Sequence, residues 1–404
     1  MFKKSRFAGR SSRLFLGLVL ALTLIATVTI AAPLQNSMAM PASAEPPDFT
    51  WEVVHDTPGV FYFSIAFPTD LVGYALGSPD WNTGGGGSGP SYISKTLDGG
   101  LTWTTTLIPG PTRYMRGLAC MDENTCWISG GSIPPYKIMR TTDGGATWGT
   151  VDDQSGWSGW VWSAGWTGQG STVMIGTAGY DPGDPTRQAN FLRATDGYTF
   201  HSVAASDYNE FVQWDFSCPL PGNCYTAAKN RSYHTSDDGA TWHPTVVPSG
   251  QYYGVACTDV NTCWLAGEYN KIAYTTNGGS NWQSAFVGSG GGARPRFYNI
   301  AMPQATGGFA VGCTNADAGT ETCTGEGMIY YTETGSTWNM LPSPSTADIM
   351  DIHAFSMDEV IVIDWDGKIW RGLNNIVPPN PYDVNDDGVV NVIDIMLVAA
   401  HWNE

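Results

Sequence analysis

The octet Thr141-Thr142-Asp143-Gly144-Gly145-Ala146-Thr147-Trp148 recurs along most of the 404-residue chain. Three other full-length copies end at Trp103, Trp242 and Trp282, and two shortened copies end at Phe200 and Trp338. Asp accepts hydrogen bonds from nearby backbone N–H groups, glycine supplies positive φ, and the flanking Thr and Trp favour strands. The octet therefore predicts a hairpin turn followed by a strand that begins with a buried aromatic side chain.

The copies end 40 to 56 residues apart, and several short β-rich runs lie between them. This spacing is typical of a β-propeller or another closed β array. The octet resembles the Asp-box, also called the bacterial neuraminidase repeat. The resemblance implies that the turns are scaffold at the periphery of the blades, so we assign no chemistry to them.

The repeat that ends near Trp282 shows the expected unit of four strands. They are predicted at residues 252–257, 263–267, 271–275 and 282–287. Six units end at the six aromatic residues named above. The seventh, at residues 352–355, 360–364 and 368–371, lacks its last strand.

A strand at residues 50–54 resembles a strand that follows an Asp-box, although no turn precedes it. Pairing it beside residues 368–371 would close the ring and leave no free sheet edge. We therefore expect an all-β fold, a seven-bladed β-propeller closed by an N-terminal strand, over residues 45–373.

The composition agrees with a turn-rich β protein, since the chain holds 49 Gly and 17 Trp and only 14% of its residues are charged. Its formal net charge is -18 at pH 7. Nucleic acid is not expected as a partner, because phosphate binding needs clustered Lys and Arg.

The N-terminus has the pattern of an export signal. Residues 3–13 are basic, residues 14–32 are apolar, and Ala42-Ser43-Ala44 offers a small-residue cleavage site. We expect a signal peptide at residues 1–44 and a secreted, extracellular or cell-surface protein. The alternative is an uncleaved membrane anchor, since the apolar run is long enough to span a bilayer. No membrane span is expected in the mature chain.

The eight cysteines agree with export. Three pairs share the spacing C-x5-C at the same place in their repeats, and a fourth pair is more widely spaced. Local disulfides are therefore predicted for Cys120–Cys126, Cys218–Cys224, Cys257–Cys263 and Cys313–Cys323. A metal site is the weaker alternative, because zinc pairs usually have C-x2-4-C spacing.

A different module follows the propeller. Residues 374–382 contain three prolines and predict a stiff linker. Residues 383–394 then match a twelve-residue calcium loop, with oxygen ligands at hard-cation spacing and a glycine, Gly388, at the sharp turn. The predicted Ca2+ ligands are Asp383, Asn385, Asp387, the Val389 carbonyl, Asn391 and Asp394.

Residues 383–404 resemble one half of a dockerin, an EF-hand-type module that binds cohesins in extracellular polysaccharide-degrading complexes. Dockerins carry two such repeats, whereas one is present here, and loop positions 10 and 11 are Val392 and Ile393. The predicted helix at residues 392–402 is apolar on almost every side and therefore needs a partner. The propeller, a second copy of the helix or a cohesin-like protein are the alternatives.

Asp-box propellers include sialidases, xyloglucan-degrading endoglucanases and the photosystem II assembly and stability factor family. The layout of residues 49–371 most resembles the last family, which implies a non-enzymatic protein that holds partners.

A sialidase Arg-Ile-Pro element is absent. Glu210 and Asp351 are a conceivable carboxylate pair for glycoside hydrolysis, but with this many acids we favour chance. The arginines (Arg113, Arg116, Arg140, Arg193, Arg231, Arg294 and Arg296) are not grouped by their spacing, and the six histidines (His55, His201, His234, His243, His353 and His401) form no metal or triad motif.

Two features suit ligand binding. Residues 80–90 and 179–188 are long Gly- or Pro-rich connections, where function on a propeller tends to lie. Trp157, Trp160, Trp162 and Trp166 are close together, which suits a stacking platform for sugars or, as we favour, packing between blades. We expect a calcium-binding recognition or scaffolding propeller with a protein or polysaccharide ligand. The alternative is an O-glycosyl hydrolase or an accessory protein in polysaccharide degradation.

Overall fold

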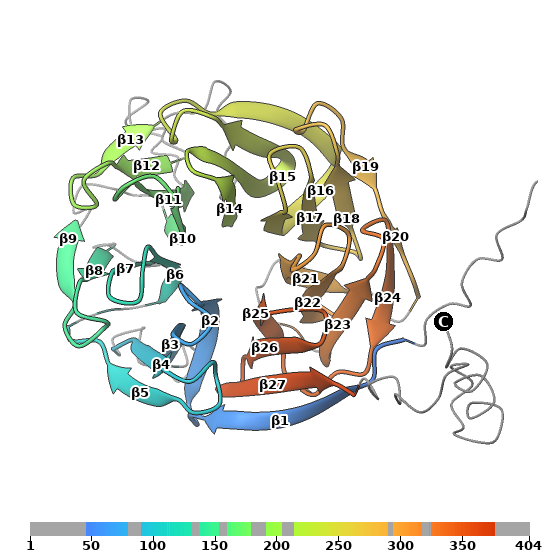
Figure 1. Cartoon of the computed structure of the whole chain (residues 1–404), viewed down its shortest axis with the longest axis horizontal. Helices are drawn as coiled ribbons and strands as arrows, with labels where there is room; N and C mark the ends of the chain where they lie inside the picture. Colours follow the sequence, from blue (N-terminus) through green and yellow to red (C-terminus); the bar gives the residue numbers. More distant parts are fainter. Residues whose placement is uncertain are drawn as a thin grey trace, which may run out of the picture. The chain divides into compact units, whose positions relative to one another are not determined.

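The computed structural model describes residues 46–79, 90–110, 112, 114–130, 137–152, 160–178, 191–203, 214–289, 294–316, 323 and 325–375. These residues contain 27 strands and no helix. Six hydrogen-bonded sheets are arranged in a ring (Figure 1). The expected all-β propeller arrangement is therefore present.

We number the sheets I to VI in chain order. Sheet I contains β2 (Val60–Ala66), β3 (Gly73–Pro79), β4 (Tyr92–Thr96) and β5 (Thr104–Leu107). Sheet II contains β6 (Met115–Cys120), β7 (Cys126–Gly130), β8 (Lys137–Thr141) and β9 (Gly149–Asp152). Sheet III contains β10 (Trp160–Trp166), β11 (Val173–Ala178), β12 (Phe191–Ala194) and β13 (His201–Val203).

The remaining sheets differ in size. Sheet IV contains β14 (Asp215–Leu220), β15 (Asn223–Thr235), β16 (His243–Cys257), β17 (Cys263–Gly267), β18 (Ile272–Thr275) and β19 (Gln283–Ser284). Sheet V contains β20 (Phe286–Val287), β24 (Thr337–Leu341), β23 (Gly327–Thr332), β22 (Gly308–Cys313) and β21 (Arg296–Ala301). Sheet VI contains β1 (Phe49–Asp56), β27 (Lys368–Asn374), β26 (Glu359–Asp364) and β25 (Ile349–Ala354).

The sheet count corrects the prediction of seven separate blades, because six hydrogen-bonded sheets are present in the described residues. The cause is the long strand β16. Its first part pairs with β15, as at Thr245 and Ser232, and its second part pairs with β17, as at Ala256 and Trp264. One uninterrupted strand therefore joins two groups of strands that the sequence predicted as separate blades.

The prediction that the N-terminal strand closes the ring is confirmed. β1 pairs with β27 in antiparallel fashion, with Trp51 opposite Gly372 and Val53 opposite Trp370. A Cβ added to Gly372 would lie only 2.6 Å from the indole of Trp51, which is too close for a side chain. Glycine is therefore required at this position. β1 thus covers an edge of β27 that would otherwise be open.

The strand predicted at residues 282–287 is divided in the structure. β19 stays in sheet IV, whereas β20 pairs with β24 of sheet V in parallel. The N–H groups of Phe286 and Gly288 donate to the carbonyls of Ser336 and Trp338, each at 2.8 Å. This crossing segment occupies the outer edge of β24, which would otherwise present unpaired backbone groups.

The Asp-box forms the predicted turn. The Asp143 carboxylate accepts from the Thr147 N–H at 2.8 Å and from the Thr147 hydroxyl at 2.6 Å, and these bonds lower the pKa of Asp143 to about 2. Gly144 and Gly145 have φ of 71° and 85°, which a residue with a Cβ rarely adopts. Trp148 then enters a hydrophobic core at 8% exposure.

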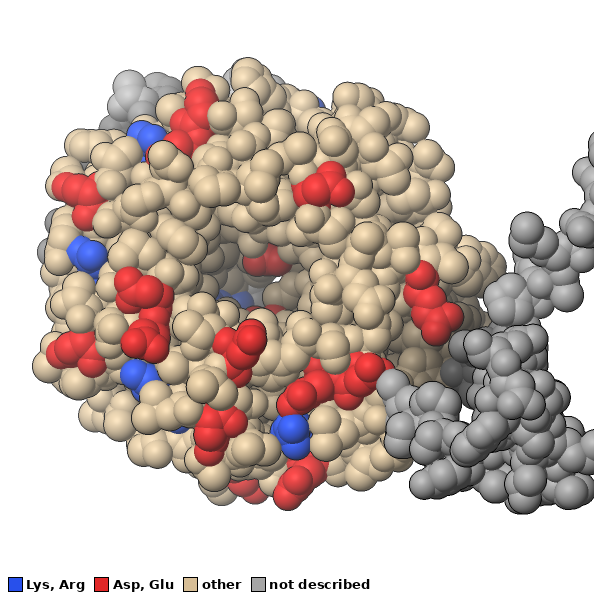
Figure 2. All heavy atoms as spheres, viewed as in Figure 1, with Lys and Arg blue, Asp and Glu red and all other residues tan. Residues whose placement is uncertain are grey.

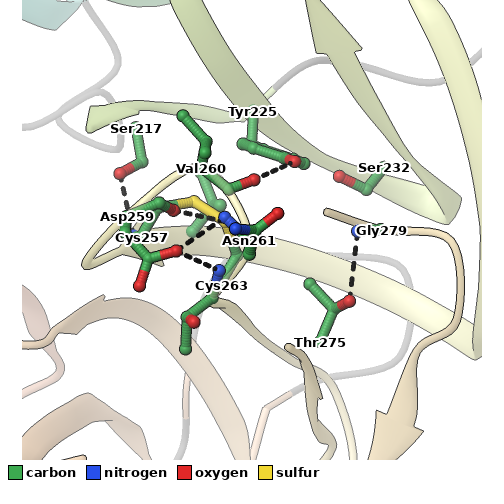
Figure 3. The surroundings of a disulfide bond; sticks show 12 residues. Ser217, Tyr225, Ser232, Cys257, Asp259, Val260, Asn261, Cys263, Thr275 and Gly279 are labelled. Carbon is green, nitrogen blue, oxygen red and sulfur yellow. Dashed lines mark hydrogen bonds between the residues drawn. A yellow bond between two sulfur atoms is a disulfide. The ribbon is translucent and has the colours of Figure 1, made fainter. Parts of the chain in front are cut away.

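All four predicted disulfides are present. Cys257–Cys263 spans the turn between β16 and β17, where the Asp259 carboxylate accepts from the N–H groups of Asn261 and Thr262 (Figure 3). The Cys257 N–H also donates to the Ser217 hydroxyl of the neighbouring strand β14 at 2.9 Å. The disulfide turn is therefore tied to the rest of its own sheet.

Among the residues that the structure describes, buried apolar side chains form seven clusters. Each cluster fills the space between neighbouring groups of strands. In one of them, Tyr74 and Leu76 of sheet I pack with Ile128 and Met139 of sheet II. The ring is thus held together by face-to-face packing of its sheets as well as by β1.

The two rims of the ring differ. The innermost strands are β2, β6, β10, β14, the second part of β16, β21 and β25, and their residues line the central cavity. The disulfides of Cys120, Cys218 and Cys257 lie where these strands end. The Asp-box turns lie at the same rim, because the N–H of Gly144 in one Asp-box donates at 3.0 Å to the carbonyl of Asn124, which lies in the turn closed by the Cys120 disulfide. At the opposite rim, β3 ends and β4 begins, and β11 ends and β12 begins; the long connections predicted at residues 80–90 and 179–188 follow β3 and β11 in the sequence. Residues 80–89 and 179–188 lie outside the described residues.

Candidate ligand-binding site in the central channel

A β-bulge recurs at one level of the innermost strands. In six of them the pairing with the next strand shifts at the same place, near the start of the strand. The extra residues are Phe63, Arg116, Trp162, Tyr253, Tyr298 and Met350. A bulge turns a side chain away from the regular alternation. Here it places large side chains in the wall of the channel.

Trp214 takes the corresponding place beside β14. Its backbone N–H donates to the Ala227 carbonyl at 3.1 Å, next to the pair formed by Asp215 and Ala227. The indole Nε1 of Trp214 is buried and has no hydrogen-bond acceptor in the described part of the chain. A buried donor without an acceptor is a place where a ligand carbonyl or hydroxyl gains a favourable bond.

These side chains contact one another around the channel. The ring centroids of Trp162 and Trp214 are 4.8 Å apart, and those of Trp214 and Tyr253 are 4.9 Å apart. Tyr298 continues the series at 6.3 Å from Tyr253. The spacings are those of favourable aromatic pairs.

An arginine continues the series in the other direction. The guanidinium of Arg116 lies 4.2 Å from the ring centroid of Trp162 and 4.8 Å from that of Phe63. Phe63 in turn meets Trp365 at 5.3 Å. We call this set the channel belt; it comprises Phe63, Arg116, Trp162, Trp214, Tyr253, Tyr298 and Trp365.

The channel belt lines a cavity of about 750 Å³. Figure 2 shows this hollow at the centre of the ring, with acidic and basic side chains inside it. The volume lies within the ~300–1,000 Å³ range of ligand pockets. The cavity is therefore the candidate functional site of the described residues.

Charged groups lie beside the tyrosines of the belt. Arg296 pairs with Glu268 at 3.0 Å, and the Tyr253 hydroxyl donates to the same carboxylate at 2.8 Å. The Tyr298 hydroxyl donates to Asp348 at 3.1 Å. Burial raises the pKa of Asp348 to about 6.

Two further carboxylates lie one residue beyond the bulge position. Asp215 accepts from the N–H of Val255 at 3.0 Å, and Asp351 accepts from the N–H of Ile65 at 2.8 Å and from the Asn299 amide at 2.5 Å. Burial raises the pKa of Asp215 to about 8 and that of Asp351 to about 7. Each carboxylate thus joins its own strand to a neighbouring innermost strand.

The residues singled out from the sequence fall in different places. Arg116 and Arg296 both reach the channel although their spacing did not group them. Arg193 pairs with Asp238 at 3.3 Å, and Arg140 lies over the ring of Tyr198 at 4.1 Å, both outside the channel lining. Asp351 lines the channel, whereas its suggested partner Glu210 lies outside the described residues.

The tryptophan-rich segment divides. Trp162 joins the channel belt, whereas Trp166 packs beside the core cluster between sheets II and III and donates to the Gly170 carbonyl at 3.0 Å. Trp157 lies outside the described residues. Packing between sheets, the interpretation that we favoured, therefore holds for Trp166 and also for Trp162, which packs on Trp214 beside sheet IV and in addition lines the channel.

Sequence reasoning missed the belt as a set. Trp214 and Tyr253 each stand four residues before the first cysteine of a C-x5-C pair, Cys218 and Cys257. The pairs Trp214-Asp215 and Tyr253-Gly254 share their pattern with Phe63-Ser64, Trp162-Ser163 and Tyr298-Asn299, near the start of the innermost strands. A large aromatic residue followed by a small or polar residue is the signal that was available.

The predicted calcium ligands at residues 383–394 lie outside the described residues, as do residues 1–44. Among the described groups, Cys313, Cys323 and Asp348 have the proximity of a metal site, but the two cysteines form a disulfide and are not thiolate ligands. No helix of the described part is long and apolar enough to cross a membrane.

Comparisons with known proteins show the fold. No model of a known protein family matches the chain, and no curated protein matches it. A solved structure of YCF48 bound to D1 peptide is 17% identical, with a TM-score of 0.57, and the match covers 83% of this chain and 99% of that one. YCF48 from Cyanidioschyzon merolae is 16% identical, with a TM-score of 0.56, over 80% and 98%.

A glycoside hydrolase has the same fold. The GH74 xyloglucanase from Xanthomonas campestris is 13% identical, with a TM-score of 0.59, and the match covers 83% of this chain and 55% of that one. Similar propellers therefore include binding proteins and enzymes. The propeller fold is shared with both and does not by itself decide between these functions.

Proposed function

We propose that this protein is an exported recognition propeller that binds a segment of a partner protein in the central channel, without catalysing a reaction. The observation that carries the proposal is the channel belt. Trp, Tyr and Arg are the residues enriched at the energetic centres of protein interfaces. Here they are gathered at one mouth of a cavity of about 750 Å³.

The polar groups of the channel favour binding over hydrolysis. General acid–base work needs carboxyl groups aimed at a substrate. Asp215 and Asp351 are instead hydrogen-bonded to backbone amides of neighbouring strands, and Asp348 accepts from Tyr298. The wall therefore acts as a fixed frame for the belt.

A peptide suits the belt better than a sugar. Trp162 and Tyr253 are each only 7% exposed, and Arg116 covers Trp162, so flat aromatic faces for sugar stacking are few. The D1 peptide bound to the similar YCF48 propeller supports the peptide interpretation. An extracellular glycoside hydrolase or accessory protein of polysaccharide degradation is the alternative, which the GH74 neighbour supports through its fold.

The test is a binding screen of the mature protein against a displayed peptide library, with a glycan array and xyloglucan hydrolysis assay in parallel. Selected peptides should bind at least about tenfold more weakly to Trp214→Ala, as expected for an interface anchor. Tyr198→Ala, an exposed aromatic residue at the opposite rim, should bind normally. Sugar release, or peptide binding indifferent to Trp214→Ala, would refute the proposal.

We also infer that the ring has seven units, with the six-stranded sheet IV counted as two. The seven separate core clusters support this count, since Trp242 and Trp282, which end two successive repeats, lie in different clusters. The ring would then be the seven-bladed propeller that the repeats predict.

The terminal segments complete the proposal from their sequence alone. The pattern of residues 1–44 supports export, and four disulfides suit an oxidising compartment. Residues 383–394 would bind Ca2+ through Asp383, Asn385, Asp387, Val389, Asn391 and Asp394. A cohesin-like partner for this module also stays a proposal.

A further inference from the structure

The first Asp-box carries an exposed apolar patch. Leu97 is 67% exposed and Leu101 is 51% exposed, and both lie in the turn that joins β4 to β5. Leu71 is 61% exposed, and its carbonyl accepts from the N–H of Gly99 in the same turn at 2.9 Å. We call Leu71, Leu97 and Leu101 the leucine patch.

The turn itself does not require these leucines. The same two positions of the other full-length octets are filled by Thr142 and Ala146, by Ser236 and Ala240, and by Thr276 and Ser280. The turns at Asp143 and Asp237 nevertheless make the same hydrogen bonds as Asp98. Exposed leucine side chains that contribute nothing to the turn indicate an interaction surface.

The patch lies beside the sheet from which the chain leaves the ring. A Cβ on Gly100 would stand 2.9 Å from Cδ1 of Ile361, so the first Asp-box packs directly against sheet VI. β27 of that sheet ends at Asn374, whose N–H donates to the carbonyl of Asp358 in the turn between β25 and β26. That turn lies where an innermost strand ends, which is the rim of the Asp-boxes.

The chain beyond this exit contains an apolar segment in need of cover. Ile393, Ile395, Met396, Leu397 and Val398 belong to the predicted helix at residues 392–402, which is apolar on almost every side. The eight residues from Asn375 to Tyr382 precede the predicted calcium loop and can span at most about 30 Å. Neighbouring sheets pack about 10 Å apart, so the segment is long enough to reach sheet I.

We propose that the C-terminal segment 392–402 docks on the leucine patch of the first Asp-box, within the same chain. The exposed leucines supply the apolar surface, and the chain's exit on the adjacent sheet at the same rim supplies the proximity. The docking would hold the calcium loop against the rim opposite the channel belt. It does not depend on what the channel binds.

The experiment is hydrogen exchange of the full mature chain in millimolar calcium. The double variant Leu97→Thr with Leu101→Ala converts the first octet into the sequence found at residues 141–148, so the turn is expected to fold. Exchange in residues 392–402 should be slow in the parent chain and become fast in this variant. Leu107→Ala, which removes a leucine 53% exposed at the opposite rim, should leave the exchange slow.

Two outcomes would overturn the proposal. The first is a hydrogen-exchange rate of residues 392–402 that is the same in the parent chain and in the double variant, whether that rate is fast or slow. The second is protection that disappears on dilution, because it would assign the helix to a second copy of the chain. Peptides of β4 and β5 report folding in the same data, so failure to fold is distinguished from failure to dock.

Discussion

The carboxylate of Asp351 accepts a hydrogen bond from the backbone N–H of Ile65 at 2.8 Å, and the two residues are 286 positions apart in the chain. This bond joins β25 of the last sheet to β2 of the first. The Asn299 amide donates to the same carboxylate and brings in β21. The ring is therefore closed at the channel wall by a buried polar contact, as well as at its periphery by β1.

The peripheral closure predicts the effect of removing β1. Deleting residues 45–55 from the mature chain should expose the edge of β27 and cost several kcal/mol, or cause aggregation. Chemical denaturation followed by tryptophan fluorescence measures the loss, with a chain that lacks only residues 1–44 as the control. Equal unfolding midpoints for the two chains would mean that β1 does not hold the ring.

The inner closure predicts an unusual dependence of stability on pH. Burial raises the pKa of Asp351 to about 7, above the value near 3.9 of an unfolded chain. Between pH 4 and pH 7 the folded protein binds more protons at Asp351 than the unfolded chain does. The contribution of this site to the free energy of unfolding is therefore full below about pH 4 and is lost as the pH rises through 7. Asp351→Asn should be less stable than the parent at pH 5, and its melting temperature should fall less between pH 5 and pH 8.

Asp366→Asn is the matched control, because Asp366 is exposed in the turn after β26 of the same sheet. Its melting temperature should follow that of the parent across the same range. A parallel fall in the parent and in Asp351→Asn would show that another group titrates. Asp215, whose pKa burial raises to about 8, is then the next carboxylate to substitute.

The scaffold was predictable because its signals are local. The Asp-box turn depends on an Asp or Asn and two positive-φ positions within eight residues. Three of the four disulfides join cysteines six residues apart in the same strand-to-strand connection, and the fourth joins cysteines ten residues apart. The pairing of β1 with β27 is long-range, but it followed from an incomplete last repeat and an unpaired first strand. Local pattern and ring closure together determine most of the fold.

The site was not predictable in the same way. Arg116 and Trp162 stand on β-bulges at one level of different strands, and Trp214 stands at the same level just before β14. No single residue type specifies such a position in a sequence. The merger of two groups of strands through β16 was missed for a similar reason. Strand β16 continues through residues 247–252 because of how it pairs with β15 and β17 in space. The sequence of these residues by itself predicts a turn.

The Asp-boxes predict a second change with pH, at the acid end. The pKa of Asp143 is lowered to about 2 by the Thr147 hydroxyl and N–H. Its contribution to stability is therefore present above pH 4 and is lost as the pH falls toward 2. Asn277 occupies the equivalent position in another octet and accepts from the Asn281 N–H at 2.9 Å.

Asp143→Asn should consequently fold and form the same turn, and its unfolding temperature should fall less steeply than that of the parent between pH 4 and pH 2. The paired substitution Asn277→Asp should do the opposite and make the acid loss steeper. Circular dichroism melts across this range test both variants. An identical acid slope in all three proteins would show that the Asp-box carboxylates do not drive acid unfolding.

Calcium binding by residues 383–394 is the last prediction, and it rests on the agreement of six positions with one coordination geometry. Asp383, Asn385, Asp387 and Asp394 should supply most ligands, with the Val389 carbonyl and Asn391 completing the shell. A single loop without a paired second loop should bind weakly, in the ~10⁻⁴–10⁻³ M range of extracellular modules.

The proper sample is the whole mature protein, because the helix that follows needs an apolar surface. Calcium should slow hydrogen exchange in residues 383–402, and Asp383→Ala with Asp387→Ala should abolish that response. An unchanged exchange rate at several millimolar calcium would make the loop an acidic turn only.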